Sequence, residues 1–285
     1  MKYFHNTSKI NWKEVRISIV GGGVSGISAA TLGKYIGANI FISDNDNSLK
    51  GSQIINNFNH EIGIHSKKIL KADLIIISPG ISDEIPIIKS CKQQHIPIVS
   101  EIEFASWFTK SPIIAITGSN GKTTTTHLLH SMCINDGKNS LLGGNIGIPF
   151  SENVLLELQS EIKDPIHVLE LSSFQLEHIE TFSPTIAGLL NISEDHMDRY
   201  NNIEDYSNAK IKITKNIKSS GMIVYNEEDS ILRKKFKQKN NATPFSTNNK
   251  KNIHFKLNAN EIFTNDLENP FILFNLNETK LKGIH

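Results

Sequence analysis

The most specific chemical pattern in the sequence is a glycine-rich turn that ends in lysine and threonine. The segment GSNGKTT at 118–124 directly follows an apolar run at 113–117. In such a turn backbone N–H groups surround phosphate oxygens, a lysine such as Lys122 contacts the β- and γ-phosphates, and a hydroxyl binds Mg²⁺. Ile116 stands where the usual motif has its first glycine. A helix start capped by Asn120 is the alternative, but the pattern favours triphosphate binding.

A second glycine-rich segment, GGGVSG at 21–26, has the spacing Gly-x-Gly-x-x-Gly. It lies between an apolar run at 15–20 and a helical pattern at 27–36, and Asp44 closes the next apolar run. Glycines at this spacing let the backbone approach a phosphate, and the helix N-terminus adds N–H donors. The pattern predicts a nucleotide-type ligand rather than a turn without one. Asp44 could accept a hydrogen bond from a ribose hydroxyl or from a base N–H.

A glutamate at the end of a later strand could hold a cation. Glu170 lies near the end of the apolar run at 167–171. A carboxylate at that end of a strand in a doubly wound sheet projects into the crevice where ligands bind. We therefore expect Glu170 to bind Mg²⁺ beside the phosphate loop, rather than to be a surface or paired carboxylate.

Ionisable residues are dense in NISEDHMDRY at 191–200, which follows another expected strand. The residues leave two interpretations open. One is a solvated acidic loop. The other is a second cation site, with His196 as a ligand and Asp198 or Arg199 around it.

Lys210 belongs to a lysine-rich helical pattern that also contains Lys212 and Lys215. Taken from the residues alone, a solvated basic helix face is the favoured interpretation. Nothing in the pattern distinguishes Lys210 from its neighbours.

The elements that must position these residues alternate between strand and helix patterns. Strands are expected at 15–20, 39–43, 72–78, 96–100, 113–117, 167–171, 185–190 and 221–225, and helices at 27–36, 85–94, 122–136, 152–160, 203–216 and 230–239. Such alternation predicts parallel sheets with crossover helices. The pattern restarts near 109–112. We expect an α/β fold with a Rossmann-like parallel-sheet domain over 1–109 and a P-loop-type α/β domain over 110–285. Short β-like pieces follow at 253–257, 261–263 and 271–276.

The composition excludes several classes of protein. Hydrophobic residues make up 38% and charged residues 21%, which is typical of globular domains, and the formal charge of +1 gives no basic excess for nucleic acid or membrane. Two cysteines, Cys91 and Cys133, without a CxxC spacing exclude a disulfide scaffold and a thiolate zinc site. No apolar run approaches about 18 residues, and residues 1–13 lack the apolar core of a signal peptide. We expect a cytoplasmic protein.

In combination and in order, the motifs resemble those of the Mur ligase family, the ATP-dependent amide ligases of peptidoglycan synthesis. The resemblance covers essentially the whole chain. It rests on ITGSNGKTTTT at 116–126, GGNIGIP at 143–149, LELSSFQLE at 169–177, LNISEDHMDRY at 190–200 and SNAKIKI at 207–213. GGGVSG at 21–26 and ISPGI at 77–81 resemble more narrowly the family member that uses D-glutamate.

The resemblance implies a reaction and its cofactors. ATP phosphorylates the carboxylate of UDP-N-acetylmuramoyl-L-alanine, and the amine of D-glutamate then displaces phosphate from the acyl phosphate. Cations and Lys122 must screen the anionic groups that are brought together. The resemblance further implies two Mg²⁺ sites, a carbamylated lysine and a monomer.

The resemblance also implies roles for individual residues, because each lies in a matching motif. Catalytic roles are implied for Lys122, Glu170, His196 and Lys210. The ATP phosphates would be bound by Ser119, Asn120, Gly121, Lys122, Thr123, Thr124 and Thr125. The metal ligands would be Thr123, Glu170, His196 and carbamylated Lys210. The UDP-linked substrate would contact Val24, Ser25, Asp44, Asn45, Ser78, Pro79, Gly80, Asn145 and Ser172, with Asp44 and Asn45 at the uracil.

The family has a third, C-terminal domain that binds the amino acid, and this chain stops at 285 inside a motif. The resemblance therefore implies a fragment without the amino-acid-binding domain, with little ligase activity expected of these residues alone. Two other functions remain open. The chain could be a non-catalytic module that binds a UDP-sugar or ATP, or a Mur ligase that uses a different amino acid.

Overall fold

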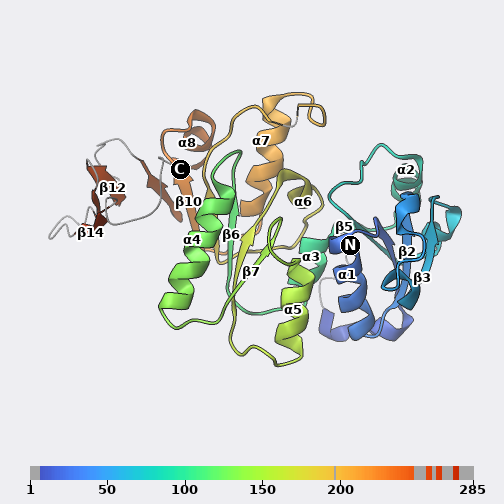
Figure 1. The fold of residues 1–285 in the computed structure, drawn as a ribbon. Coiled ribbons are helices and arrows are strands. Elements are labelled where there is room, and N and C mark those ends of the chain that lie inside the picture. Colours follow the sequence, from blue (N-terminus) through green and yellow to red (C-terminus); the bar gives the residue numbers. More distant parts are fainter. Residues whose placement is uncertain (1–6, 196, 247–254, 259–260, 265–271, 276–285) are drawn as a thin grey trace.

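The structure is a computed structural model. It describes residues 7–195, 197–246, 255–258, 261–264 and 272–275. Two parallel sheets follow one another along the chain, the first in blue to cyan and the second in green to orange (Figure 1). This confirms the expected α/β class. None of the helices in the described ranges is long and apolar enough to cross a membrane.

The first sheet has five parallel strands in the order β3-β2-β1-β4-β5. The strands are β1 (Arg16–Val20), β2 (Asn39–Asp44), β3 (Asn59–Ile62), β4 (Leu74–Ile77) and β5 (Ile98–Ser100). The helices are α1 (Val24–Tyr35), α2 (Pro86–Gln93) and α3 (Glu101–Ser106), with single 3₁₀ turns η1 (Thr7–Lys9), η2 (Trp12–Glu14), η3 (Asn47–Leu49), η4 (Ile55–Asn57) and η5 (Lys67–Lys71). All four residues of β4 are buried, as expected of a strand within a parallel sheet that is covered on both faces.

The second sheet has six parallel strands in the order β11-β10-β9-β6-β8-β7. They are β6 (Ile113–Thr117), β7 (Ser140–Gly144), β8 (Ile166–Glu170), β9 (Ile186–Leu189), β10 (Met222–Asn226) and β11 (Ala242–Phe245). The helices are α4 (Lys122–Asn135), α5 (Phe150–Leu158), α6 (Ser173–Glu177), α7 (Ile203–Ile211) and α8 (Ser230–Phe236), with η6 (Lys212–Thr214). A small antiparallel sheet follows, made of β12 (Phe255–Asn258), β13 (Glu261–Thr264) and β14 (Ile272–Asn275).

The hydrophobic core continues from the first sheet into the second. One cluster of buried side chains contains Ile102 and Phe104 of α3 together with Phe150 and Val154 of α5. Helices α1 and α3 pack against α5, which lies between the two sheets in Figure 1. Apolar packing of this kind holds the two sheets in one relative position.

Several elements differ from the sequence-based expectation. The expected helix at 203–216 ends at Ile211 and continues as a 3₁₀ turn, where the Thr214 hydroxyl donates to the Ile211 carbonyl. Strand β3 was not expected, because its residues NHEI have no apolar run. The short helices α3 and α6 were also missed. Each starts directly after a strand at a serine N-cap, without a break in the chain that would signal it.

Candidate functional site

The two glycine-rich loops lie at equivalent places in the two sheets. The first follows β1, between β2 and β4, and the second follows β6, between β8 and β9. Ligands of open α/β sheets bind at the carboxyl ends of strands, where neighbouring connections leave a crevice. Loops from both flanking strands therefore reach each glycine-rich loop.

Steric fit explains why the first loop needs glycine. Gly21 has φ = 103°, and a Cβ there would lie 2.6 Å from the Cβ of Ser78. The Ser78 hydroxyl donates to the Gly21 carbonyl at 3.0 Å. A Cβ at Gly26 would lie 1.9 Å from the same carbonyl oxygen. Gly21 therefore lets the loop after β4 approach the first loop, and Gly26 lets α1 approach it.

Asp44 holds the first loop through its backbone. One carboxylate oxygen accepts from the amide N–H of Gly22 at 2.5 Å, and the other accepts from the N–H of Asp46 at 2.7 Å. Asn45 beside it is exposed, as is Val24 at the start of α1, with 74% of its surface accessible. Asp44 thus organises the loop itself, and its expected contact with a base stays a prediction.

The second loop curls around its own lysine. Gly121 has φ = 81° and directly precedes α4. The Lys122 ammonium donates to the carbonyls of Gly118 and Ser119 at 3.0 and 2.9 Å. The loop is therefore already closed around a cation at the start of α4, where backbone N–H groups favour an anion. The hydroxyl-bearing residues after it are exposed at Thr123 and Thr124 and half-buried at Thr125.

Glu170 lies beside this loop and is nearly inaccessible, with 2% of its surface exposed. Its carboxylate accepts from the Thr123 hydroxyl at 2.8 Å and from the Asn145 amide at 2.8 Å. A Cβ at Gly144 would lie 2.3 Å from the Glu170 carbonyl oxygen, so glycine is required for Asn145 to reach it. The structure brings together three residues that the sequence placed far apart.

A segment after β9 clamps the second loop. Asn191 accepts from the Asn120 backbone N–H through its side-chain oxygen at 2.8 Å and donates to the Asn120 carbonyl at 3.0 Å. The Ser119 hydroxyl donates to the Ser193 carbonyl and accepts from the Ser193 N–H, at 3.0 and 2.9 Å. Asp229 holds the same segment from its other side by accepting from the Ile192 N–H at 2.7 Å. Sequence reasoning did not anticipate this clamp.

Lys210 is buried, with 1% of its surface exposed, so the interpretation of a solvated basic face was wrong. Its ammonium lies 4.6 Å from the centre of the Tyr206 ring, and the Tyr206 hydroxyl is 3.2 Å from the Ser119 hydroxyl. Burial and the nearby charge of Lys122 lower the pKa of Lys210 to about 7, although Asp195 and Glu170 act in the opposite direction. Lys210 therefore has a large neutral fraction at neutral pH.

The remaining expected site residues lie at separate places in the fold. Pro79 and Gly80 lie on the loop after β4, and the Pro79 carbonyl accepts from the guanidinium of Arg199 at 3.0 Å. The Ser172 hydroxyl accepts from the Gln175 N–H as the N-cap of α6, so part of its role is structural. Ser25 is half-buried in the first turn of α1. His196 lies outside the described residues.

The donor set fits Mg²⁺. Among the described residues no group of three or more His, Cys, Asp or Glu side chains comes together as a metal site. Mg²⁺ does not require one, because it is usually held by one or two carboxylates together with phosphate and water oxygens. Glu170 and Thr123 offer hard oxygen atoms next to the phosphate loop, which suits that mode of binding.

Family comparisons agree with this geometry. A family model described as the Mur ligase middle domain matches residues 116–282, and one described as Mur ligase MurD-like, N-terminal domain, matches residues 15–100. A UDP-N-acetylmuramoylalanine--D-glutamate ligase of Chloroherpeton thalassium is 41% identical over 234 residues, which are 79% of this chain and 49% of the relative. The ligase of the same name from Christiangramia forsetii is 39% identical over 279 residues, 95% of this chain and 61% of the relative. The chain thus spans about half to three-fifths of these curated relatives.

Solved structures share the fold. The Neisseria meningitides UDP-N-acetylmuramate:L-alanyl-gamma-D-glutamyl-meso-diaminopimelate ligase has a TM-score of 0.59 at 18% identity, and the match covers 88% of this chain and 84% of that one. A murein peptide ligase of Psychrobacter arcticus has a TM-score of 0.53 at 19% identity and covers 88% of this chain and 59% of its own. Because the middle-domain model matches more than half of the sequence and the fold agrees, the chain belongs to the Mur ligase family.

Proposed function

We propose that this chain is the substrate- and ATP-binding part of an ATP-dependent, ADP-forming ligase that adds D-glutamate to UDP-N-acetylmuramoyl-L-alanine. The observation that carries the proposal is the grouping of Lys122, Thr123, Glu170 and buried Lys210 around one glycine-rich loop. The names of the curated relatives support the choice of substrates. We further propose a division into a UDP-substrate domain over 1–109 and an ATP domain over 110–285, acting in the cytoplasm as a monomer.

On the ATP side, the loop from Ser119 to Thr125 binds the phosphates. Backbone N–H groups at the start of α4 supply neutral donors, and the Lys122 ammonium supplies charge at the β- and γ-oxygens. Lys122 must exchange its two loop carbonyls for phosphate oxygens, which lie within reach of the same side chain. The clamp from Asn191 and Ser193 keeps the loop closed meanwhile.

Thr123 and Glu170 would hold one Mg²⁺, and His196 with Lys210 would hold a second near the transferred phosphoryl group. A metal ion there would neutralise charge on the phosphoryl oxygens as the reaction proceeds. Lys210 must be modified for this role, since an ammonium repels a cation. Its pKa of about 7 supplies the neutral amine that reacts with CO₂, and the resulting carbamate is anionic.

On the substrate side, the first loop with Val24 and Ser25 would approach the UDP diphosphate, and Asp44 and Asn45 the uracil. Asp44 already uses both oxygens to hold the loop. Its carboxylate oxygens have further lone pairs, so a base N–H can be accepted in addition. Ser78, Pro79, Gly80, Asn145 and Ser172 would line the path of the muramoyl group towards ATP.

The chemistry proceeds in two steps. A carboxylate oxygen of UDP-N-acetylmuramoyl-L-alanine attacks the γ-phosphorus, and the bond from that phosphorus to the β–γ bridging oxygen breaks, which releases ADP. The amine of D-glutamate then attacks the acyl carbon, the carbon–oxygen bond to phosphate breaks, and an amide, phosphate and a proton result. Charged partners in a partly buried site make each electrostatic contact stronger than in water.

The test measures how fast the protein, as its genome encodes it, releases phosphate from ATP. We expect phosphate only when ATP, UDP-N-acetylmuramoyl-L-alanine and D-glutamate are all present. Turnover with L-lysine or diaminopimelate in place of D-glutamate would assign another Mur ligase reaction. Tight binding of the UDP-linked substrate and ATP without turnover under any amino acid would favour a non-catalytic binding module.

A further inference from the structure

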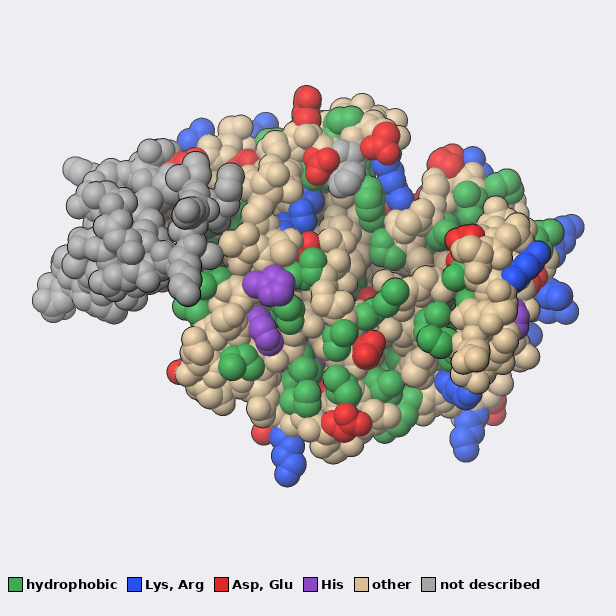
Figure 2. All heavy atoms as spheres, viewed as in Figure 1, with side chains coloured by type: hydrophobic (Ala, Val, Ile, Leu, Met, Phe, Trp, Pro, Cys, Tyr) green, Lys and Arg blue, Asp and Glu red, His purple; other side chains and the backbone are tan. Residues whose placement is uncertain are grey.

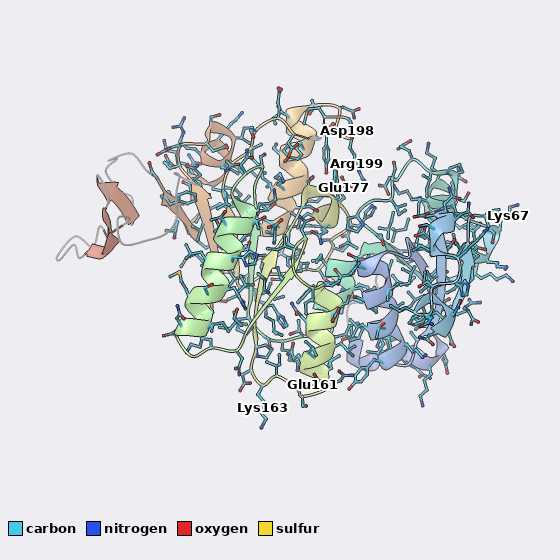
Figure 3. The ribbon with its side chains drawn as sticks, viewed as in Figure 1. Lys67, Glu161, Lys163, Glu177, Asp198 and Arg199 are labelled. Carbon is cyan, nitrogen blue, oxygen red and sulfur yellow. The ribbon has the colours of Figure 1, made fainter. Side chains whose placement is uncertain are left out.

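Arg199 connects the two sheets at the edge where both glycine-rich loops lie. Its guanidinium donates to the carbonyls of Pro79 and Ile81, at 3.0 and 3.1 Å, on the loop after β4 of the first sheet. It also donates to the Glu177 carboxylate at 3.0 Å, at the end of α6 beside the second sheet. Figure 3 shows Glu177 and Arg199 close together at this edge, near α6 and α7.

Aromatic side chains fix the orientation of the guanidinium. Its central carbon lies 4.3 Å from the centre of the Phe174 ring, and that ring stacks on Tyr200 with an interplanar angle of 8°. The Tyr200 hydroxyl donates to the second oxygen of Glu177 at 2.5 Å. Only about a fifth of the Arg199 and Glu177 side chains is exposed, so the contact is partly shielded from water. A lysine could not reproduce it, because one ammonium lacks the planar fork that reaches two carbonyls and a carboxylate.

Short links run from Arg199 to each glycine-rich loop. On one side, Pro79 directly follows Ser78, whose hydroxyl holds the Gly21 carbonyl. On the other side, Arg199 lies six residues after Ser193, which exchanges hydrogen bonds with Ser119. The same contact thus joins the loop after β4, which holds the first glycine-rich loop, to the segment whose earlier residues hold the second.

We propose that Arg199 is a positioning residue that aligns the carboxylate of the UDP-linked substrate with the phosphates of ATP. This inference rests on the proposed function. Phosphoryl transfer needs the reacting atoms in a near-attack arrangement, and a misplacement of about 1 Å can lower the rate about 100-fold. Arg199 would set that arrangement by holding the loop at 79–81 against Glu177 at the end of α6. It need not touch either substrate.

The test compares Arg199→Ala and Arg199→Lys with the wild type in the protein as its genome encodes it. We expect kcat for phosphate release to fall at least about tenfold in both variants, with the KM for ATP within about twofold of wild type. Glu177→Gln keeps the two carbonyl contacts and should give a smaller loss of kcat. Tyr35→Phe is the matched control, because its hydroxyl bonds the Leu158 carbonyl between the same two sheets, far from both loops.

Hydrogen exchange provides a second readout that needs no turnover. In the ligand-free protein, Arg199→Ala should speed amide exchange at 80–85, and Tyr35→Phe should not. A kcat for Arg199→Ala within twofold of wild type, or a loss equal to that of Tyr35→Phe, would overturn the inference. Absence of turnover in the wild type would instead contradict the proposed function and leave the exchange result to decide on Arg199.

Discussion

The two glycine-rich loops occupy the same place in two parallel sheets, yet different side chains hold them. In the first, a carboxylate from Asp44 and a hydroxyl from Ser78 bind backbone groups of the loop. In the second, Lys122 lies inside the loop, and its ammonium donates to two carbonyls of the loop. Topology therefore gives both sheets the same crevice beside a glycine-rich loop, while the side chains around it set the local charge.

The distribution of charged side chains on the surface agrees with the placement of Lys122 inside the second loop. Lys and Arg side chains are scattered among acidic ones over the face that Figure 2 shows, and they do not gather in one patch. Lys122, the cation that we propose for the phosphates of ATP, is half-buried at the second loop. Such placement gives each charge more effect than it would have in solvent. A triphosphate needs that effect more than a diphosphate ester does, since it carries more negative charge.

The largest expected effect tests whether the two loops bind different ligands. Lys122→Ala should lower phosphate release about 100- to 1,000-fold, because a charged donor to the transferred group is lost. Binding of UDP-N-acetylmuramoyl-L-alanine should stay within about twofold of wild type, as measured by calorimetry. Equal loss of both would show that the two loops do not serve separate ligands.

The next effect concerns stability. Gly26→Ala would place a Cβ against the Gly21 carbonyl, so we expect the free energy of unfolding to fall by about 2 kcal/mol or more. Gly23 has no atom within 4 Å of an added Cβ. Because Gly23 is the N-cap of α1, where alanine is less favourable than glycine, Gly23→Ala should cost no more than about 1 kcal/mol. Urea unfolding of both variants measures this. If both variants lose the same stability, the contact of an added Cβ at residue 26 with the Gly21 carbonyl does not explain why glycine is needed there.

One pH effect should depend on the buried lysine beside the second loop. The pKa of Lys210 is about 7 when folded, below that of an exposed lysine, so the unfolded chain binds more protons above pH 7. The free energy of unfolding should therefore rise from pH 7 to pH 9, by about 1–2 kcal/mol more in wild type than in Lys210→Met. The measurement is urea unfolding in CO₂-free buffer, with exposed Lys235→Met as control. A parallel pH profile for wild type and Lys210→Met would contradict it.

The smallest effect concerns the first loop. Asp44→Asn replaces one acceptor oxygen with an amide donor, so either Gly22 or Asp46 loses its partner. We expect a loss of about 1 kcal/mol in stability, together with weaker binding of the UDP-linked substrate and unchanged binding of ATP. Thermal unfolding and calorimetry on the same sample measure both. Weaker ATP binding in this variant would indicate that the loops are coupled through the fold.

Sequence reasoning from local motifs pointed to the two glycine-rich loops, Asp44 and Glu170, and the roles of these residues stay predictions. Glu170 was expected beside the phosphate loop, and its bond to Thr123 agrees with that expectation. Lys210 was different. Its lysine-rich surroundings predicted solvent exposure, and only the packing of α7 near Ser119, through Tyr206, places it inside. The resemblance to a family, not the local pattern, singled it out.

The sequence by itself determined the class of fold, the two glycine-rich turns and the order of the motifs, because these depend on apolar periodicity and local backbone preference. Tertiary structure alone decided which distant residues meet. Asn145 reaches Glu170, Asp229 supports the segment at 191–193, and Arg199 crosses from one sheet to the other. Such contacts follow from how strands are ordered in a sheet and how two sheets pack, and no local spacing encodes that order.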